Sequence, residues 1–469
     1  MEWWHVPAIG LAAWIATVAP AICTDLEKPS RYVMTSPNLP LPAPMPDLHR
    51  MIGTSVLGRP LLVRHLGPED APLRVLLLCG QHGDERGIRR ALAEFLAAEQ
   101  CNLRGNPFLQ VAVLAEANPD GAEQRTRANA EHVDLNRDHL LLQAPETRAI
   151  HRFVADWEPH LVVDLHNYPS RRAHLVRKNL RLAWDVCLDH PTNPATSLGS
   201  GHPLLDSLMQ LLDGRLAEHG HLFGRYSIVD GAAGVRHGTP ALVDARNVLS
   251  LRYGCLTLLL EARNPGELET RDERQRVRHA VAEALRGILD WAVSHEEQLI
   301  RLRPDGNINP RVPLRYRRRA ASAPAEIPVV DLSSAQAGTL LFPRYRPYVE
   351  GRRSISPPPA YAVPLEQSAL LGLLSRQGFH GHLANDNARY TVQQLVLSAP
   401  YRVAETVTAD VSLAGSVIFP FRQRGGQLLA LLLEPESRYA RHMLLDWDAS
   451  SNPAYPVRRV LETEDALRH

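Results

Sequence analysis

Four short, almost wholly apolar runs constrain the fold of this 469-residue chain more than any other feature. They are Leu73–Cys79, Phe108–Leu114, Leu161–Leu165 and Cys255–Leu260. Runs of this length and character are typical of strands that are buried on both faces of a sheet. Helical segments are expected between and after them, at Asp84–Gln100, Pro145–Trp157, Leu204–His219 and Asp272–Glu297. Strands that alternate with helices predict an α/β fold with a mainly parallel sheet.

Potential metal ligands follow two of these predicted strands. His82 and Glu85 are three residues apart at the entry to a helix, so both side chains can reach one point. His166 ends the third strand. Taken singly, the first pair is also typical of a surface and His166 of a structural histidine. Together they form a His₂Glu set with a fourth position left for water, as in catalytic zinc sites. The sequence therefore predicts one Zn²⁺ per chain, with Asp164 as a candidate to orient a ligand.

The segment between the two halves of this site carries donors suited to a substrate. Asn118-Pro119-Asp120-Gly121 is a dense turn signal, and Arg127 and Asn136-Arg137 follow it. The planar guanidinium of arginine matches a carboxylate, and a fixed cation can stabilise a polarised carbonyl. The alternative is that these arginines form ordinary surface ion pairs.

Glu261 comes directly after the last predicted strand. A carboxylate at such a strand end either pairs with an arginine or takes part in catalysis. A metal-activated water needs a nearby base that accepts its proton and passes it to the leaving amine. Glu261 is the candidate for this role.

The order of these motifs resembles the carboxypeptidase A-like family of zinc metallopeptidases, over about residues 60 to 295. The motifs are His82-x-x-Glu85, Asn118-Pro119-Asp120-Gly121, Arg127, Asp134-Leu135-Asn136-Arg137, His166 and Glu261. The resemblance implies a mixed, mainly parallel eight-stranded sheet flanked by helices. It also implies a smaller, mainly β C-terminal domain, as in some bacterial members, because Pro357–Pro364 and Leu433-Glu434-Pro435 are similar to that part.

The resemblance also assigns roles. His82, Glu85 and His166 bind zinc, Arg127 stabilises the oxyanion, Asn136 and Arg137 hold the terminal carboxylate, and Glu261 is the general base and then the general acid. The implied substrate is a peptide or small amide that loses its C-terminal residue.

Other readings of the sequence remain open. One is an N-acyl amino acid deacylase like aspartoacylase and succinylglutamate desuccinylase, and another is a catalytically silent metal- or protein-binding scaffold. The tyrosine that caps the substrate in digestive members has no clear counterpart, and Tyr168, Tyr226 and Tyr253 are candidates.

Composition and linker signals predict the remaining organisation. The expected regions are a possible signal peptide at 1–23, a catalytic domain at 24–302, a Pro/Arg-rich linker at 303–328 and a mainly β accessory domain at 329–469. Within the last region we expect a helix at Leu365–Arg376 and short strands that include Leu428–Leu433. A net charge of +1 and few aromatic residues argue against a nucleic-acid partner.

The N-terminal run Val6–Ala21 is apolar and ends in Ala19-Pro20-Ala21, which resembles a signal-peptide cleavage site. A secreted or periplasmic location is therefore favoured, with a cytoplasmic one as the alternative. The run is short for a membrane span, so no stable membrane association is expected.

Overall fold

The computed structural model describes residues 49–196, 202–230, 234–264, 270–302, 311–398, 402–440, 445–448 and 450–462. The predicted signal peptide and the following arm to residue 48 lie outside these ranges. Within them, no helix has both the length and the apolar character that crossing a membrane requires.

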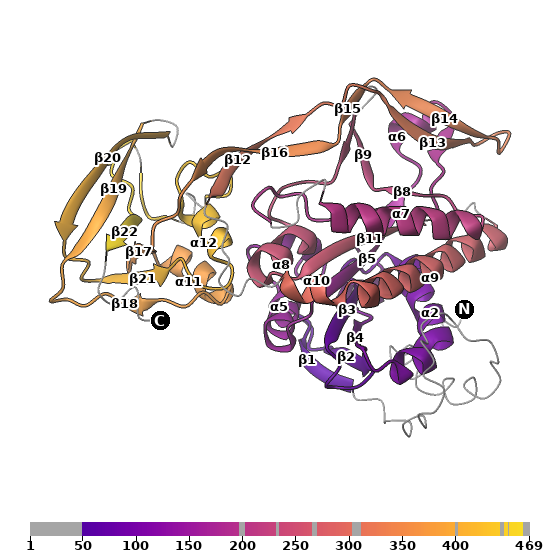
Figure 1. Ribbon diagram of the computed structural model, residues 1–469, viewed down its shortest axis with the longest axis horizontal. Coiled ribbons are helices and arrows are strands. Elements are labelled where there is room, and N and C mark those ends of the chain that lie inside the picture. The colour runs from indigo at the N-terminus through magenta and orange to yellow at the C-terminus, as the bar shows by residue number, and fades with distance from the viewer. Residues whose placement is uncertain are drawn as a thin grey trace, which may run out of the picture.

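An eight-stranded mixed sheet forms the centre of the first region, in the order β1-β2-β4-β3-β5-β11-β7-β8 (Figure 1). Its strands are β1 (His49–Thr54), β2 (Pro60–Leu66), β3 (Leu73–Cys79), β4 (Leu109–Leu114), β5 (Leu161–Pro169), β7 (Val186–Asp189), β8 (Phe223–Arg225) and β11 (Leu256–Asn264). The four central strands β4, β3, β5 and β11 are mutually parallel. The strands β1, β2 and β7 pair in the antiparallel sense. This confirms the predicted fold class.

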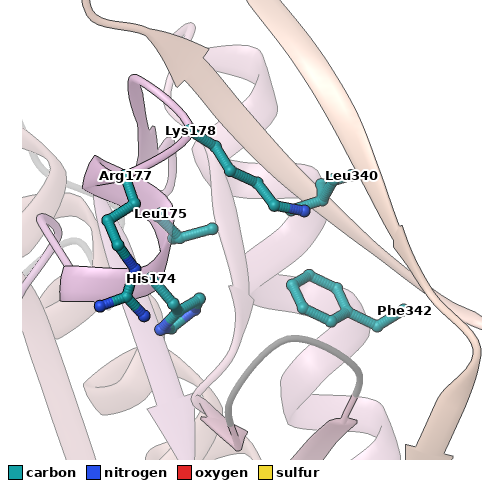
Figure 2. A pocket seen from close by; sticks show the side chains of 6 residues that line it. All are labelled: His174, Leu175, Arg177, Lys178, Leu340 and Phe342. Atoms are coloured by element: carbon teal, nitrogen blue, oxygen red, sulfur yellow. The ribbon is translucent and has the colours of Figure 1, made fainter.

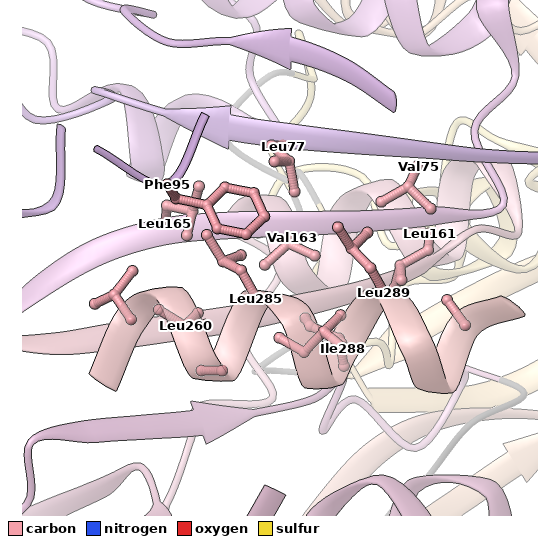
Figure 3. Close-up of a cluster of buried hydrophobic side chains, with 14 of the residues drawn as sticks. Val75, Leu77, Phe95, Leu161, Val163, Leu165, Leu260, Leu285, Ile288 and Leu289 are labelled. Carbon is pink, nitrogen blue, oxygen red and sulfur yellow. The ribbon is translucent and has the colours of Figure 1, made fainter. Parts of the chain in front are cut away.

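Both faces of the central sheet are covered by helices, which explains the continuous apolar runs. Along β3, Val75 and Leu77 enter the hydrophobic cluster on one face, whereas Leu76 and Leu78 enter the cluster on the other. The first cluster packs against α2 (Arg86–Gly105), α7 (Pro203–Glu218) and α9 (Arg271–Ser294), and Figure 3 shows α9 side chains meeting the strands. The second packs against α5 (Pro145–Trp157) and α8 (Ala245–Tyr253).

Shorter elements connect this framework. They are α3 (Pro119–Gln124), α4 (Leu135–Asp138), α6 (Ala173–Val176), β6 (Leu180–Leu182), β9 (Ser227–Asp230), β10 (Gly234–His237) and α10 (Glu296–Arg301). Helices α3 and α4 lie in the loop that separates the two halves of the predicted metal site.

The C-terminal region contains a second sheet, of six strands, in the order β18-β21-β17-β22-β19-β20. Its strands are β17 (Ala360–Pro364), β18 (His382–Leu383), β19 (Tyr390–Ser398), β20 (Arg402–Val411), β21 (Ser416–Pro420) and β22 (Arg458–Glu462). Two helices accompany it, α11 (Ser368–Arg376) and α12 (Gly426–Leu433). A two-stranded ribbon of β12 (Val312–Arg319) and β16 (Tyr348–Ile355) runs between the two regions (Figure 1).

The described strands cross the boundaries that the sequence predicted at residues 303–328 and 329–469. The predicted linker contains β12 and the start of β13 (Ala325–Asp331). In β12 the exposed Arg315, Arg317 and Arg319 alternate with half-buried residues, and the strand pairs with β16. Strand β13 pairs with β6 of the first region and with β14 (Ala337–Phe342). Strand β15 (Arg344–Arg346) pairs with β10. The six-stranded sheet therefore begins only at β17, and independent folding of the two regions stays a prediction.

The predicted strand at Leu428–Leu433 is wrong, because these residues form helix α12. A short apolar run does not distinguish a buried strand from a buried helix by periodicity. All six residues are buried, in the cluster that joins the second sheet to the first region.

Candidate metal centre

The sheet register brings the predicted metal ligands together. Strand β3 ends at Cys79, Gly80 turns the chain with a φ of +76°, and His82 and Glu85 lie between this turn and helix α2. His166 lies on β5, which pairs in parallel with β3. Parallel strands end at one edge of a sheet, so the three side chains converge there.

The three candidate ligands form a compact, buried cluster. His82 Nδ1 lies 2.8 Å from Glu85 Oε1, and His166 Nδ1 lies 3.1 Å from Glu85 Oε2. The two Nδ1 atoms are 3.1 Å apart. Among the described residues, this is the only group of three or more His, Cys, Asp or Glu side chains with geometry that could hold a metal ion.

Each histidine of the cluster has a carboxylate on its other ring nitrogen. His82 Nε2 lies 3.1 Å from Asp134 Oδ1, and His166 Nε2 lies 3.0 Å from Asp164 Oδ1. When both Nε2 atoms donate to these carboxylates, both Nδ1 lone pairs point at the shared centre. Burial alone would raise the pKa of Glu85, but His166 and His82 lower it well below its usual range. The cluster is thus a set of nitrogen and oxygen donors that a cation fits.

Glu261 lies directly beside this cluster. It is the register partner of His166 in the parallel β5–β11 pair. The side chain is buried, and its Oε2 has no hydrogen-bond partner. Burial raises the pKa of Glu261 to about 7, with Glu85 adding to the rise and His166 opposing it. A group that titrates near neutral pH is suited to both accept and donate a proton.

Arg127 faces the same centre. Its Nε donates to Asp134 Oδ2 at 2.9 Å, and its Nη1 lies 3.3 Å from His82 Nδ1 and 3.7 Å from Glu85 Oε1. The predicted turn explains this placement, since Asn118 caps helix α3 and its side chain donates to the Arg127 carbonyl at 3.3 Å.

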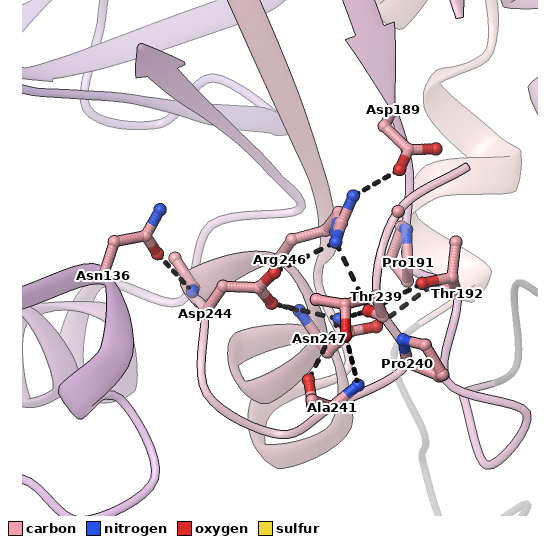
Figure 4. A network of polar contacts seen from close by, with 12 residues as sticks. Asn136, Asp189, Pro191, Thr192, Thr239, Pro240, Ala241, Asp244, Arg246 and Asn247 are labelled. Carbon is pink, nitrogen blue, oxygen red and sulfur yellow. Dashed lines mark hydrogen bonds and ion pairs between the residues drawn. The ribbon is translucent and has the colours of Figure 1, made fainter. Parts of the chain in front are cut away.

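The adjacent residues Asn136 and Arg137 behave differently. Asn136 is buried, and its Oδ1 accepts from the Ala245 backbone N–H at 3.0 Å (Figure 4). Its Nδ2 lies 3.0 Å from His166 Nε2. The amide oxygen therefore has a partner within the chain, whereas Nδ2 faces a ring nitrogen that donates to Asp164. Arg137 is exposed and donates to the Asn136 carbonyl at 2.7 Å.

Arg137 has no ion-pair partner within the described ranges. The nearby Asp138 carboxylate instead accepts hydrogen bonds from the Gln143 and Ala144 backbones and from Thr147. The guanidinium of Arg137 therefore keeps capacity for an external anion.

The three candidate capping tyrosines are distinguished by their contacts. The Tyr168 hydroxyl donates to the Trp184 carbonyl, and the Tyr253 hydroxyl contacts His151. Burial, and then Glu261, raise the pKa of Tyr226 to about 12, and Arg172 donates to its hydroxyl at 3.3 Å. Of the three tyrosines, Tyr226 is the one whose pKa Glu261 helps to raise.

Sequence reasoning missed Gln81 and His139, which lie behind the cluster. Gln81 Nε2 donates to Asp164 Oδ1 at 2.7 Å, and Gln81 Oε1 lies 2.7 Å from His139 Nε2. The only sequence signal for Gln81 was its position next to His82.

A separate cavity of about 150 Å³ between α6 and β14 contains none of the predicted site residues (Figure 2).

Comparisons with known proteins identify sequence relatives of the chain. No family model matches the sequence. The chain is 23% identical over 426 residues to carboxypeptidase 2 of Trichophyton tonsurans, covering 84% of this chain and 77% of that protein. It is 37% identical over 113 residues to murein peptide amidase A of Vibrio campbellii, covering 24% of this chain and 41% of that protein.

Among solved structures, a metallo-carboxypeptidase from Burkholderia cenocepacia matches with a TM-score of 0.40 and 19% identity, over 53% of this chain and 66% of that one. This structural similarity is too low to add to the sequence matches. The sequence relationship to carboxypeptidase 2 extends over most of both chains. These matches support a carboxypeptidase A-like metallopeptidase family for the chain.

Proposed function

We propose that this chain is a zinc-dependent carboxypeptidase, with one Zn²⁺ bound by His82, Glu85 and His166. The observation that carries the proposal is the convergence of two imidazole Nδ1 atoms and one carboxylate, all buried, within 3.1 Å of one another. Three protein ligands of the His₂Glu type leave a coordination position open, which is the arrangement of catalytic zinc sites.

Zinc in such a site polarises a substrate carbonyl and lowers the pKa of water. Glu261 accepts a proton from the attacking water and delivers it to the leaving amine. The position of Glu261 beside His166 and its pKa of about 7 support this role. Arg127 stabilises the negative charge that develops on the carbonyl oxygen, as its guanidinium faces the ligand cluster.

Arg137 binds the terminal carboxylate of the substrate in this proposal. Its guanidinium is exposed, and the side-chain hydrogen bond that it makes goes to the Asn136 carbonyl, which supports this role. Asn136 lies next to it, and we retain it as a second contact: its Oδ1 is bonded to the Ala245 N–H, and its Nδ2 donor faces the Nε2–H of His166 rather than an acceptor. A charge-assisted contact to a carboxylate selects a free C-terminus over a blocked one.

The relatives support a peptide or peptide-like amide as the substrate. They are named carboxypeptidase 2 and murein peptide amidase A. We therefore propose that the chain releases residues from the C-terminal end of peptides, with no nucleic-acid partner.

The test uses purified full-length protein with zinc, and the same protein after treatment with a chelator. Each is given a peptide with a free C-terminus, the same peptide with an amidated C-terminus, and N-acyl amino acids. We expect zinc-dependent release of the C-terminal residue from the free peptide only. Equal cleavage of both peptides contradicts the carboxypeptidase assignment. Hydrolysis of N-acyl amino acids alone supports the deacylase instead, and metal binding without hydrolysis supports a silent scaffold.

A further inference from the structure

A continuous chain of buried polar side chains leads away from the metal cluster. Asp164 Oδ1 lies 3.0 Å from His166 Nε2 and 2.7 Å from Gln81 Nε2. Gln81 Oε1 lies 2.7 Å from His139 Nε2. All four side chains belong to residues that are at most 2% exposed.

The chain of contacts continues toward the C-terminal region. His139 Nδ1 lies 3.1 Å from His151 Nε2, and His151 Nδ1 lies 3.0 Å from the Tyr253 hydroxyl. His151 is 2% exposed and Tyr253 is 4% exposed. We refer to Gln81, His139, His151 and Tyr253 as the polar relay.

Chemistry fixes the direction of the hydrogen bonds in the relay. An amide oxygen only accepts, so His139 Nε2 must donate to Gln81 Oε1. Burial lowers the pKa of both His139 and His151, so each is neutral and carries one N–H. His151 Nε2 therefore donates to His139 Nδ1, and the Tyr253 hydroxyl donates to His151 Nδ1. Every hydrogen bond of the relay points toward the metal cluster.

The relay ends at Asp164, which contacts the candidate metal ligand His166. Gln81 Nε2 donates to Asp164 Oδ1, and that oxygen also accepts from His166 Nε2. Asn136 Nδ2 also lies 3.0 Å from His166 Nε2. It is an amide N–H donor, so it cannot accept a hydrogen bond from a proton on His166 Nε2. Asp164 is therefore the group that keeps the His166 proton on Nε2 and leaves Nδ1 free for a metal.

The outer end of the relay is held by the C-terminal region. Arg424, just before α12, donates from Nε and Nη2 to the Tyr253 carbonyl at 3.1 and 2.9 Å. Gln377, just after α11, donates from Nε2 to the carbonyls of His139 and Leu140 at 2.9 and 2.7 Å. Gln377 is only 1% exposed.

We propose that the polar relay positions the metal ligand His166 and that the C-terminal region, through Gln377 and Arg424, holds the relay in place. The inference rests on the proposed function, because a metal on Nδ1 is what makes the ring orientation of His166 matter. The C-terminal region thereby contributes to metal affinity without supplying a ligand. Residues that orient a metal ligand typically change metal affinity roughly ten- to a hundredfold when they are replaced.

The first test replaces the end of the relay that contacts Asp164. Gln81→Leu introduces an apolar side chain of similar size and removes both hydrogen bonds of the Gln81 amide. We expect Zn²⁺ affinity, measured by competition with a chromophoric chelator, to fall roughly ten- to a hundredfold. We also expect the visible spectrum of the Co²⁺-loaded protein to change, since this spectrum reports ligand geometry. The matched control is Gln110→Leu, which removes a buried amide that contacts Trp157 and lies outside the relay.

The second test replaces the contact from the C-terminal region. Gln377→Leu should weaken Zn²⁺ binding in the same direction as Gln81→Leu, but by less. Gln367→Leu is the control, because the side chain of this buried glutamine bonds to the Asp446 backbone, within the C-terminal region. Tyr253→Phe removes the hydroxyl that begins the relay and should also weaken Zn²⁺ binding. Thermal unfolding of every variant separates a change in metal affinity from a loss of folded protein.

The outcomes separate this inference from the proposed function. A wild-type chain that binds no metal contradicts both. A wild-type chain that binds zinc and hydrolyses peptides, with Gln81→Leu unchanged in zinc affinity and Co²⁺ spectrum, overturns the relay alone. Equal zinc affinity in Gln377→Leu and Gln367→Leu overturns the part assigned to the C-terminal region.

Discussion

The carboxyl edge of the central sheet and the six-stranded C-terminal sheet use buried charge in opposite ways. In the C-terminal region, the buried Glu434 carboxylate accepts from the Tyr361 hydroxyl and from Arg459 Nε and Nη2. At the edge of the central sheet, Glu261 Oε2 is buried without a partner, and the Glu85 oxygens lie 2.8 and 3.1 Å from two imidazole nitrogens. A satisfied buried charge is structural, whereas unsatisfied donors and acceptors that converge on one point indicate chemistry.

The largest expected effect is the loss of a candidate metal ligand. His166→Ala removes one of three ligands, so we expect zinc to be lost and peptide hydrolysis with it. Elemental analysis of the purified variant measures the first result and a peptide assay the second. His382→Ala, an exposed histidine in the C-terminal sheet, is the control and should change neither. Full zinc occupancy in His166→Ala would show that the cluster is not the metal site.

Glu261→Gln should separate catalysis from metal binding. The variant keeps the shape of the side chain and loses its ability to accept a proton. We expect normal zinc content and a kcat that falls by about 10²–10⁴-fold, the usual contribution of general acid–base catalysis. A kcat close to the wild-type value would mean that another group accepts the proton.

Arg137→Ala should affect recognition of the substrate's terminus. Loss of a hydrogen bond to a charged group costs about 1.5–3 kcal/mol, or roughly ten- to a hundredfold in kcat/KM. The loss should appear with a free C-terminal carboxylate and be small with the amidated peptide. The variant should unfold at the wild-type temperature, because Arg137 is exposed and its side chain bonds only to the Asn136 carbonyl. A large loss of thermal stability with no change in substrate preference would instead assign Arg137 a structural role.

The raised pKa of Glu261 predicts a pH dependence. Glu261 must be a carboxylate to accept a proton, so kcat/KM should fall about tenfold per pH unit below its pKa. In the metal-free protein this pKa is about 7, and a bound cation favours the carboxylate and moves it lower. The acidic limb of the profile should therefore lie at or below about pH 7 and disappear in Glu261→Gln.

Stability of the metal-free protein should respond to the same group. Its folded pKa of about 7 lies above the ordinary value of 4.5, so the folded state holds the proton more tightly than the unfolded state. The contribution of Glu261 to stability therefore decreases as pH rises from 4.5 through 7. Comparing thermal unfolding of wild type and Glu261→Gln across this range isolates that contribution.

The smallest effect on activity is expected in the C-terminal core. Ile418 is fully buried in a cluster formed only by residues from 360 to 460. Ile418→Ala should cost about 2–5 kcal/mol of stability and leave zinc affinity and kcat/KM unchanged. Ile288→Ala, the same change beneath the central sheet, is the matched comparison for the unfolding measurement. A matching loss of zinc affinity in Ile418→Ala would mean that the metal site depends on the whole second sheet rather than on Gln377 and Arg424.

Sequence by itself determined the central sheet and identified the three side chains that converge as the candidate metal cluster. Runs such as Leu73–Cys79 and Leu161–Leu165 are local signals, because a strand buried on both faces must be apolar at every position. The polar residues that follow them, His82 and His166, stand out for the same reason. Their order along the chain carried the resemblance to the family.

Tertiary structure alone decided the partners of these residues and the architecture of the C-terminal region. Gln81, His139 and His151 are far apart in sequence, and only the packing of β3, α5 and the intervening loop brings them into one line. Leu428–Leu433 is apolar enough for either a strand or a helix, and in the folded chain it forms the buried helix α12. The local pattern of apolar residues indicates which residues are buried. Hydrogen-bond partners depend on distances between side chains, which only the folded chain sets.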